Sequence, residues 1–330
     1  MEHNPGGNCR AQLSGGQSDL PAFFSFWGTA PLDIPIEWTP LARSLCLRQT
    51  SNVLYIAVDT LIPLRGHSFH GLDEFTAALD HEAIPAVWLT SRSRLQFDDA
   101  RRKHGHTQPF IAEDGCAVYL PEGYFHLRPV SDPTRTRKAA TVRLGRFTCI
   151  PVAEALPATA DALQTLSHDT DVPVVTLRSL SPRELVQNVS LPQREAELAR
   201  QRDFDDIFFF AGASDEEVQK FLAEGRSRNL QFRQHGVLWS AAIGPSVQRC
   251  IRELAKLYDR ALRYHAHTLG IATADLAAGL FPFCERTILL SDRKAEEAYQ
   301  DRPDAPHSRH LPLQAPDVWE QLLSTVTPKN

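Results

Sequence analysis

Residues 53–61 read Val53-Leu54-Tyr55-Ile56-Ala57-Val58-Asp59-Thr60-Leu61, an apolar run that ends in an acid and a hydroxyl. A second apolar run, at 86–89, ends in Thr90-Ser91-Arg92-Ser93-Arg94, and a helical pattern separates the two. Strands that alternate with helices in this way predict a parallel sheet with right-handed crossovers. Ligand sites of open α/β sheets lie at the carboxyl ends of the strands. We therefore expect a ligand site where these polar groups follow the strands.

The bulk composition excludes several classes of function. The chain has 330 residues, of which 42% are hydrophobic and 23% charged, and its net charge is −5. A slightly acidic chain offers no electrostatic footprint for nucleic acid. No apolar run reaches the roughly 18 residues of a membrane span, and the N-terminus lacks the pattern of a signal peptide. We expect a cytoplasmic protein without nucleic-acid or membrane partners, in which six scattered cysteines are reduced.

Residues 1–48 are predicted to be a partly flexible N-terminal extension. Gly-rich and Ser-rich punctuation surrounds an apolar group that consists of Phe23, Phe24, Phe26 and Trp27. Such a group is too apolar to remain in water. It either packs back on the body of the protein or forms a docking site for a protein partner.

The rest of the chain predicts two domains. Strands and helices alternate over residues 49–127 and again over 239–330, which we assign to one α/β core. Residues 128–238 have an α+β pattern and are expected to form an inserted domain. A hairpin is predicted around Asp114-Gly115, because Asp-Gly between apolar arms is a strong turn signal.

Several stretches resemble motifs of the haloacid dehalogenase superfamily, and within it the mannosyl-3-phosphoglycerate phosphatases. Residues 90–94 are similar to a Thr-Ser-Lys-Thr-Arg motif. Residues 109–121 read Pro-Phe-Ile-Ala-Glu-Asp-Gly-Cys-Ala-Val-Tyr-Leu-Pro and are similar to Pro-Phe-Ile-x-Glu-Asn-Gly-x-x-Ile-Tyr-x-Pro. Residues 202–206 are similar to Arg-Glu-Phe-Asp-Glu. The resemblance implies a Rossmannoid parallel sheet with an inserted α+β cap of the C2 type.

The resemblance also implies a mechanism, and the first motif falls short of it. Such enzymes transfer a phosphoryl group to an aspartate and then to water, and a second acid two residues later moves the proton. If Asp59 is the nucleophile, Leu61 stands at the position of this acid. If Asp59-Thr60-Leu61 matches Asp-Gly-Thr-Leu without its Gly, Ala57 stands at the position of the nucleophile. Both registers remain open, and each lacks one carboxylate.

The third and fourth motifs of the resemblance are also incomplete. The family places a Lys where the helix after the cap begins, but residues 241–249 contain no Lys. Ile271 occupies the place of an acid that normally binds Mg²⁺, and Asp275 persists. Asp59 and Asp275 alone predict a weak or absent Mg²⁺ site, so Mg²⁺ is expected only if the protein is active.

The candidate site residues each have a second interpretation. Thr90, as a catalytic hydroxyl, and Ser91 either bind phosphate or cap the next helix. Glu113 and Asp114 either contact a ligand or only shape a turn. In the cap, Arg202 either recognises an anion, as Arg233 also could, or lies on a solvated helix face. The full set of predicted substrate contacts is Ser91, Arg92, Glu113, Asp114, Gly115 and Arg202.

Two His-x-His pairs occur outside these motifs. They are His104-Gly105-His106 and His265-Ala266-His267. A metal site needs further ligands, and none stands at a motif spacing. The sequence therefore predicts no metal at either pair.

Two functions are consistent with this pattern. The first is a catalytically impaired phosphatase relative that acts by binding, either as a regulatory or scaffolding partner of another enzyme or as a sensor of a phosphorylated metabolite. The alternative is a diverged Mg²⁺-dependent phosphatase that hydrolyses a phosphorylated sugar or glycerate through Asp59.

Overall fold

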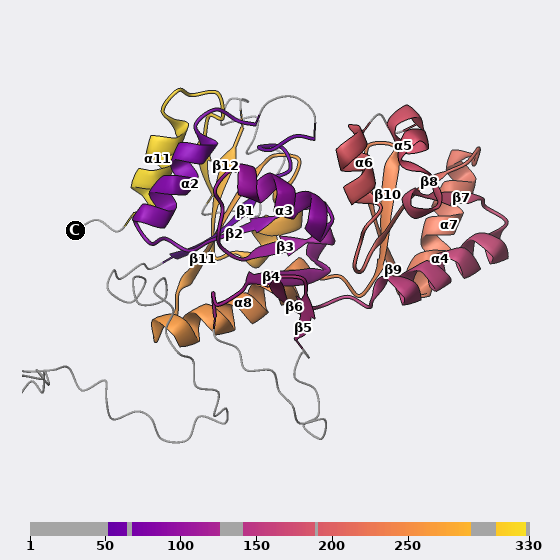
Figure 1. The fold of residues 1–330 in the computed structure, drawn as a ribbon, viewed down its shortest axis with the longest axis horizontal. Coiled ribbons are helices and arrows are strands. Elements are labelled where there is room, and N and C mark those ends of the chain that lie inside the picture. Colours follow the sequence, from indigo (N-terminus) through magenta and orange to yellow (C-terminus); the bar gives the residue numbers. More distant parts are fainter. Residues whose placement is uncertain (1–51, 65–67, 126–140, 189–190, 292–307, 328–330) are drawn as a thin grey trace, which may run out of the picture. The chain divides into compact units, whose positions relative to one another are not determined.

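The computed structural model describes residues 52–64, 68–125, 141–188, 191–291 and 308–327 (Figure 1). The predicted extension with Phe23, Phe24, Phe26 and Trp27 lies outside these residues. Among the described helices, none has the length and apolarity to cross a membrane. Cys116, Cys149, Cys250 and Cys284 are free thiols, and the first three are buried.

A nine-stranded sheet forms the core, with the strand order β13-β12-β11-β1-β2-β3-β4-β6-β5. The pairings from β13 to β3 are parallel, and those from β3 to β5 are antiparallel. Its strands are β1 (Asn52–Ala57), β2 (Ala86–Leu89), β3 (Phe110–Ala112), β4 (Ala117–Pro121), β5 (Val142–Leu144), β6 (Phe147–Pro151), β11 (His267–Thr273), β12 (Arg286–Leu290) and β13 (Ser308–Leu311).

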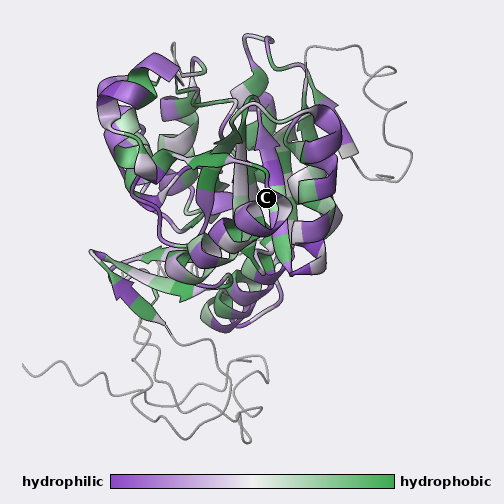
Figure 2. Ribbon diagram, turned by 90° about the vertical axis from the view of Figure 1, so that its right-hand side faces the viewer, coloured by the Kyte–Doolittle hydropathy of each residue, from purple (hydrophilic) through white to green (hydrophobic). Residues whose placement is uncertain are grey.

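Helices cover both faces of this sheet because alternate side chains of each strand point to opposite faces. Leu54 and Ile56 pack with α2 (Leu72–His81), α3 (Arg94–Lys103) and α11 (Val318–Val326). The other face, with Val53 and Tyr55, packs against α8 (Val247–Leu262) and α9 (Ala277–Leu280). In Figure 2 the strands are mostly hydrophobic, whereas the helices carry both hydrophobic and hydrophilic residues.

A separate four-stranded antiparallel sheet, in the order β7-β8-β10-β9, forms the cap. Two helices pack on one face of it and two on the other, so the cap has its own apolar clusters. The cap elements are β7 (Val174–Thr176), β8 (Asp206–Phe210), β9 (Leu230–His235), β10 (Leu238–Ile243), α4 (Leu156–Thr170), α5 (Pro182–Asn188), α6 (Gln193–Ala199) and α7 (Asp215–Ser227).

The strand pairing differs from the predicted domain ranges in two places. Strands β5 and β6 fall in the range 128–238, yet they extend the core sheet, with Tyr119 of β4 opposite Cys149 of β6. The physical reason is that the β3–β4 hairpin leaves the outer backbone groups of β4 without partners, and β6 satisfies them. At the other end, β10 continues the cap sheet to Ile243. The domain ranges as a whole stay a prediction.

Local signals place several helix ends. Ser214 caps α7, and Glu217 returns the reciprocal bond, which completes a capping box. Ser93 and Gln96 form a second capping box at the start of α3. The alternative in which Thr90 and Ser91 cap this helix is therefore wrong, because Ser93 already fills that role.

Candidate functional site

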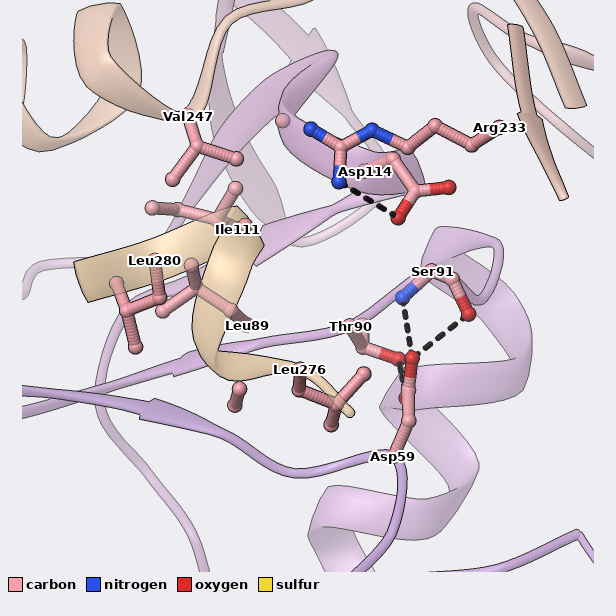
Figure 3. Close-up of a pocket in the computed structure, with 13 residues that line it drawn as sticks. Asp59, Leu89, Thr90, Ser91, Ile111, Asp114, Arg233, Val247, Leu276 and Leu280 are labelled. Atoms are coloured by element: carbon pink, nitrogen blue, oxygen red, sulfur yellow. Dashed lines mark hydrogen bonds and ion pairs between the residues drawn. The ribbon is translucent and has the colours of Figure 1, made fainter. Parts of the chain in front are cut away.

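A small pocket opens at the carboxyl ends of β1 and β2, where the sequence predicts the site. Polar residues lie on one side of it and apolar residues on the other (Figure 3). Its lining comprises Ala57, Asp59, Leu89, Thr90, Ser91, Ile111, Asp114, Gly115, Arg233, Val247, Leu276, Gly279 and Leu280.

The carboxylate of Asp59 is the centre of the polar side. Thr90 donates its hydroxyl hydrogen bond to Oδ1 of Asp59. The backbone N–H and the hydroxyl of Ser91 both donate to Oδ2, at 2.7 Å each. Arg92 Nε lies 3.8 Å from Oδ1, and this arginine also donates to the carbonyl of Ile62. Together, Thr90 and Ser91 form a set of donors for an anion, and the anion that they bind in the structure is Asp59 (Figure 3).

The first motif leaves two candidates for the nucleophile position, Ala57 and Asp59, and both line the pocket. Ala57 is the last residue of β1, pairs with Leu89 of β2 and is 7% exposed. Asp59 lies two residues beyond it, past the end of the strand. The end of β1 thus presents a methyl group to the pocket, followed by one carboxylate.

The side of the pocket opposite Asp59 is apolar. Val247 begins α8, where the resemblance implies a Lys, and Leu276 and Leu280 come from the segment after β11. Gly115 allows α8 to approach closely, since a Cβ at this position would lie 2.6 Å from the backbone nitrogen of Val247. The Gly115 carbonyl accepts the N–H of Ser246, the N-cap of α8.

The residues at the pocket do not fit a Mg²⁺ ion. Both oxygens of Asp59 already accept hydrogen bonds, and Asp275 is not part of the lining and accepts one from Thr60 at 2.8 Å. Ile271 is fully buried in the apolar core. Within the described ranges, neither acid belongs to a group of three metal-ligating side chains. Mg²⁺ prefers oxygen ligands in near-octahedral geometry, which this set does not supply.

Asp114 joins the core to the cap hairpin formed by β9 and β10. It lines the pocket and accepts hydrogen bonds from Nε2 of His235 at 2.7 Å and from the Ser240 hydroxyl at 3.4 Å. Arg233, also on the lining, lies 3.9 Å away. Burial favours the neutral acid, but His235 and Arg233 outweigh it and hold the pKa of Asp114 below its usual range. Asp114 is therefore an anion that orients two cap side chains.

Glu113 does not line the pocket. Its carboxyl group is completely buried and accepts the backbone N–H groups of Asp203, Phe204 and Asp205 at 2.8–3.1 Å. Burial raises the pKa of Glu113 to about 8, and the charge of Asp205 adds to this rise. The role of Glu113 is therefore to hold the segment that precedes β8.

Arg202 lies beneath the pocket rather than in it. It forms a two-point ion pair with Asp205, and its guanidinium donates to the carbonyl of Ser91 at 2.6 Å. The prediction of a solvated helix face is wrong, since α6 ends at Ala199 and the side chain is 6% exposed. Arg202 fixes the backbone that carries Ser91, and it does not reach the lining.

The structure thus brings together part of the predicted set. Asp59, Thr90, Ser91, Asp114 and Gly115 line one pocket, whereas Arg92, Glu113, Arg202 and Asp275 do not. Sequence reasoning missed His235 and Ser240. The sequence holds a weak signal for His235. Arg233 and His235 are two residues apart in a segment that ends at Gly236, so in a strand both side chains point to the same face.

No family model matches the chain. Among solved structures, a haloacid dehalogenase-like hydrolase from Bacteroides thetaiotaomicron aligns with a TM-score of 0.52 at 8% identity, covering 83% of this chain and 99% of that one. The fold is therefore similar to that of this hydrolase, and it has the predicted parallel Rossmannoid sheet and antiparallel cap.

The chain is also distantly similar to glucosyl-3-phosphoglycerate/mannosyl-3-phosphoglycerate phosphatases. It is 24% identical to the one from Persephonella marina over 52% of this chain and 60% of the relative. For the one from Methanococcoides burtonii, the identity is 20% over 58% of this chain and 68% of the relative. The first match thus spans less than two thirds of the relative.

Proposed function

We propose that the pocket beside Asp59 binds the phosphate-bearing part of a phosphorylated sugar or glycerate. The observation that carries the proposal is the set of donors at the end of β2. Two hydroxyls and one backbone N–H, from Thr90 and Ser91, converge on a carboxylate. Charge-assisted hydrogen bonds of this kind also bind phosphate oxygens. Arg233 adds a positive charge at the rim.

The first candidate outcome of binding is hydrolysis. Asp59 is a carboxylate on the lining and lies beside the proposed phosphate donors, which supports it as the nucleophile. The names of the two relatives support this candidate and suggest a glycosylated 3-phosphoglycerate as substrate. Because the residues present do not fit Mg²⁺, no step of this chemistry is assigned to a metal.

The second candidate is binding without turnover, as in a sensor or a regulatory partner. Ala57 at the end of β1 favours it, since a methyl group stands where one of the two registers of the first motif needs the nucleophile. A docking role for Phe23, Phe24, Phe26 and Trp27 remains part of this proposal. The docking role is tested by comparing the proteins that co-purify with the intact chain and with a chain that lacks residues 1–48. If both forms retain the same proteins, the docking role is wrong.

One set of measurements separates these outcomes. Phosphate release and calorimetric binding are measured for mannosyl- and glucosyl-3-phosphoglycerate, with and without Mg²⁺, on the intact chain. Turnover that disappears in Asp59→Asn supports the phosphatase. Binding without turnover, weakened about 10- to 100-fold in Thr90→Val, supports the sensor.

A matched control is Thr165→Val, which removes an exposed hydroxyl from α4 of the cap domain. It is expected to change neither the phosphate release nor the binding affinity. If the intact chain neither binds nor hydrolyses these compounds, the proposed ligand class is wrong. Thr90→Val and Thr165→Val with equal affinity would show that the end of β2 is not the site.

A further inference from the structure

A group of metal-ligating side chains lies at the end of the sheet opposite the pocket. His265 and His267 flank the start of β11, and Glu285 immediately precedes β12. Because β11 and β12 run parallel, their amino ends are adjacent. The seven residues of β11 separate this group from the pocket end by about 20 Å. The group is thus independent of the proposed phosphate site.

The ligand atoms of the three residues are close enough to share one ion. They lie within 4.8 Å of one another. Among the described residues, no other three metal-ligating side chains come this close together. Nε2 of His265 is 3.4 Å from one Glu285 oxygen, and Nδ1 of His267 contacts the other. Ligands about 2.0–2.1 Å from a tetrahedral zinc ion are about 3.3–3.4 Å apart, so little movement is required.

Neighbouring groups hold these ligands in orientation. Asp259 contacts Nδ1 of His265 at 3.2 Å and accepts the N–H of Ala266 at 3.0 Å. This contact leaves Nε2 of His265 directed to Glu285. The Glu285 carboxylate lies within 3.5 Å of the hydroxyl and the N–H of Thr268. A carboxylate behind a ligating imidazole is the usual arrangement in protein metal sites, where it fixes the ring and its tautomer.

We propose that His265, His267 and Glu285 bind one divalent transition-metal ion, with zinc as the best match. Two imidazoles and one carboxylate suit Zn²⁺, Ni²⁺ or Cu²⁺, whereas Mg²⁺ and Ca²⁺ require more oxygen ligands. Three protein ligands leave a fourth position for water. All three side chains are more than 40% exposed, so the ion exchanges readily with solvent.

The test is a Zn²⁺ titration of the intact chain in competition with a chromophoric chelator. The parent is expected to bind one Zn²⁺ more than His267→Ala or Glu285→Gln. Asp259→Asn is expected to keep the site with affinity reduced about tenfold, because it loses only the orienting carboxylate. Co²⁺ in place of Zn²⁺ is expected to give the visible absorption of a four-coordinate ion in the parent but not in His267→Ala or Glu285→Gln.

His81→Ala is the matched control. His81 is also exposed and also contacts a glutamate, Glu82, at 2.9 Å, but it forms part of no such group of three within the described residues. It is expected to leave the Zn²⁺ stoichiometry unchanged. Far-ultraviolet circular dichroism checks that each variant is folded. His267→Ala and Glu285→Gln each give an independent measurement of the lost Zn²⁺ ion. Equal stoichiometry and affinity in the parent, His267→Ala and Glu285→Gln would overturn the proposal.

Discussion

The hydroxyl of Thr90 donates to the carboxylate of Asp59, so the donor that we propose for phosphate already binds an anion of the chain itself. A phosphate that enters the pocket must compete with Asp59 for Thr90 and Ser91, or share them at the cost of repulsion. Two negative charges about 4 Å apart repel each other by roughly 1–4 kcal/mol at effective dielectric constants between those of water and of a protein surface.

Asp59→Ala is therefore expected to increase the affinity for inorganic phosphate about tenfold or more, since it removes the charge and frees the donors. Isothermal titration calorimetry at fixed pH and ionic strength measures this. Asp275→Ala removes an equal charge from a residue that is hydrogen-bonded to Thr60 instead, and it should have a smaller effect. An affinity of Asp59→Ala equal to that of the parent would show that Thr90 and Ser91 do not bind phosphate.

Gly115→Ala is expected to destabilise the fold by more than about 2 kcal/mol. Gly115 has φ of 90°, and an added Cβ would meet the backbone nitrogen of Val247 at 2.6 Å. Gly123→Ala is the comparison, because Gly123 has φ of 74° but nothing within 4 Å of the new Cβ. It should lose only about 1 kcal/mol through backbone strain. Urea unfolding measures the free energy of unfolding of both variants. Equal losses in Gly115→Ala and Gly123→Ala would contradict the close packing of α8 against Gly115.

Arg202→Ala is expected to lower the free energy of unfolding by about 3–5 kcal/mol, because it leaves Asp205 buried and unpaired beside Glu113. Arg228→Ala provides the contrast. Arg228 pairs with Asp169 and Glu224 on the exposed surface of the cap, where solvent screens such pairs. Chemical denaturation of both variants should show a large loss only for Arg202→Ala.

The buried Glu113 predicts a stability that falls as the pH rises. Unfolded glutamate loses its proton near pH 4.5, whereas in the fold the pKa is raised to about 8. Between these values the folded state binds more protons, so each pH unit removes up to about 1.4 kcal/mol of stability, and the loss ends above the folded pKa. Urea unfolding of the parent and Glu113→Gln from pH 5 to 9 measures the difference. Parallel pH profiles would contradict a raised pKa.

The sequence predicts those parts of the fold that depend on local pattern. The bounds of β2 agree with the apolar run at 86–89, and β1 covers the first part of the run at 53–61, because buried parallel strands are continuously apolar. Strands β5 and β6 were not predicted. β5 is short and largely exposed, and the pairing partner of β6, β4, is distant in sequence. Long-range pairing of this kind leaves no local signal.

The difference between local patterns and long-range contacts also explains which site residues the sequence predicts. Asp59 and Thr90 were predicted to be near each other because parallel strands end at one edge of a sheet. In contrast, the contacts of Glu113 with residues 203–205 depend on how the cap segment returns to the core. Glu285 was not recognised as a third ligand for His265 and His267, because β11 and the segment after it separate them in sequence.

The position of β1 between β2 and β11 also matters during synthesis. Asn52 pairs with His267, so one edge of a fully buried and mostly apolar strand has no partner until the ribosome has made more than two hundred further residues. At roughly 5–20 residues per second, this delay is about 10–40 s. Over that time the nascent chain exposes an aggregation-prone edge. Its yield in a cell should therefore depend on chaperones that bind apolar segments during translation.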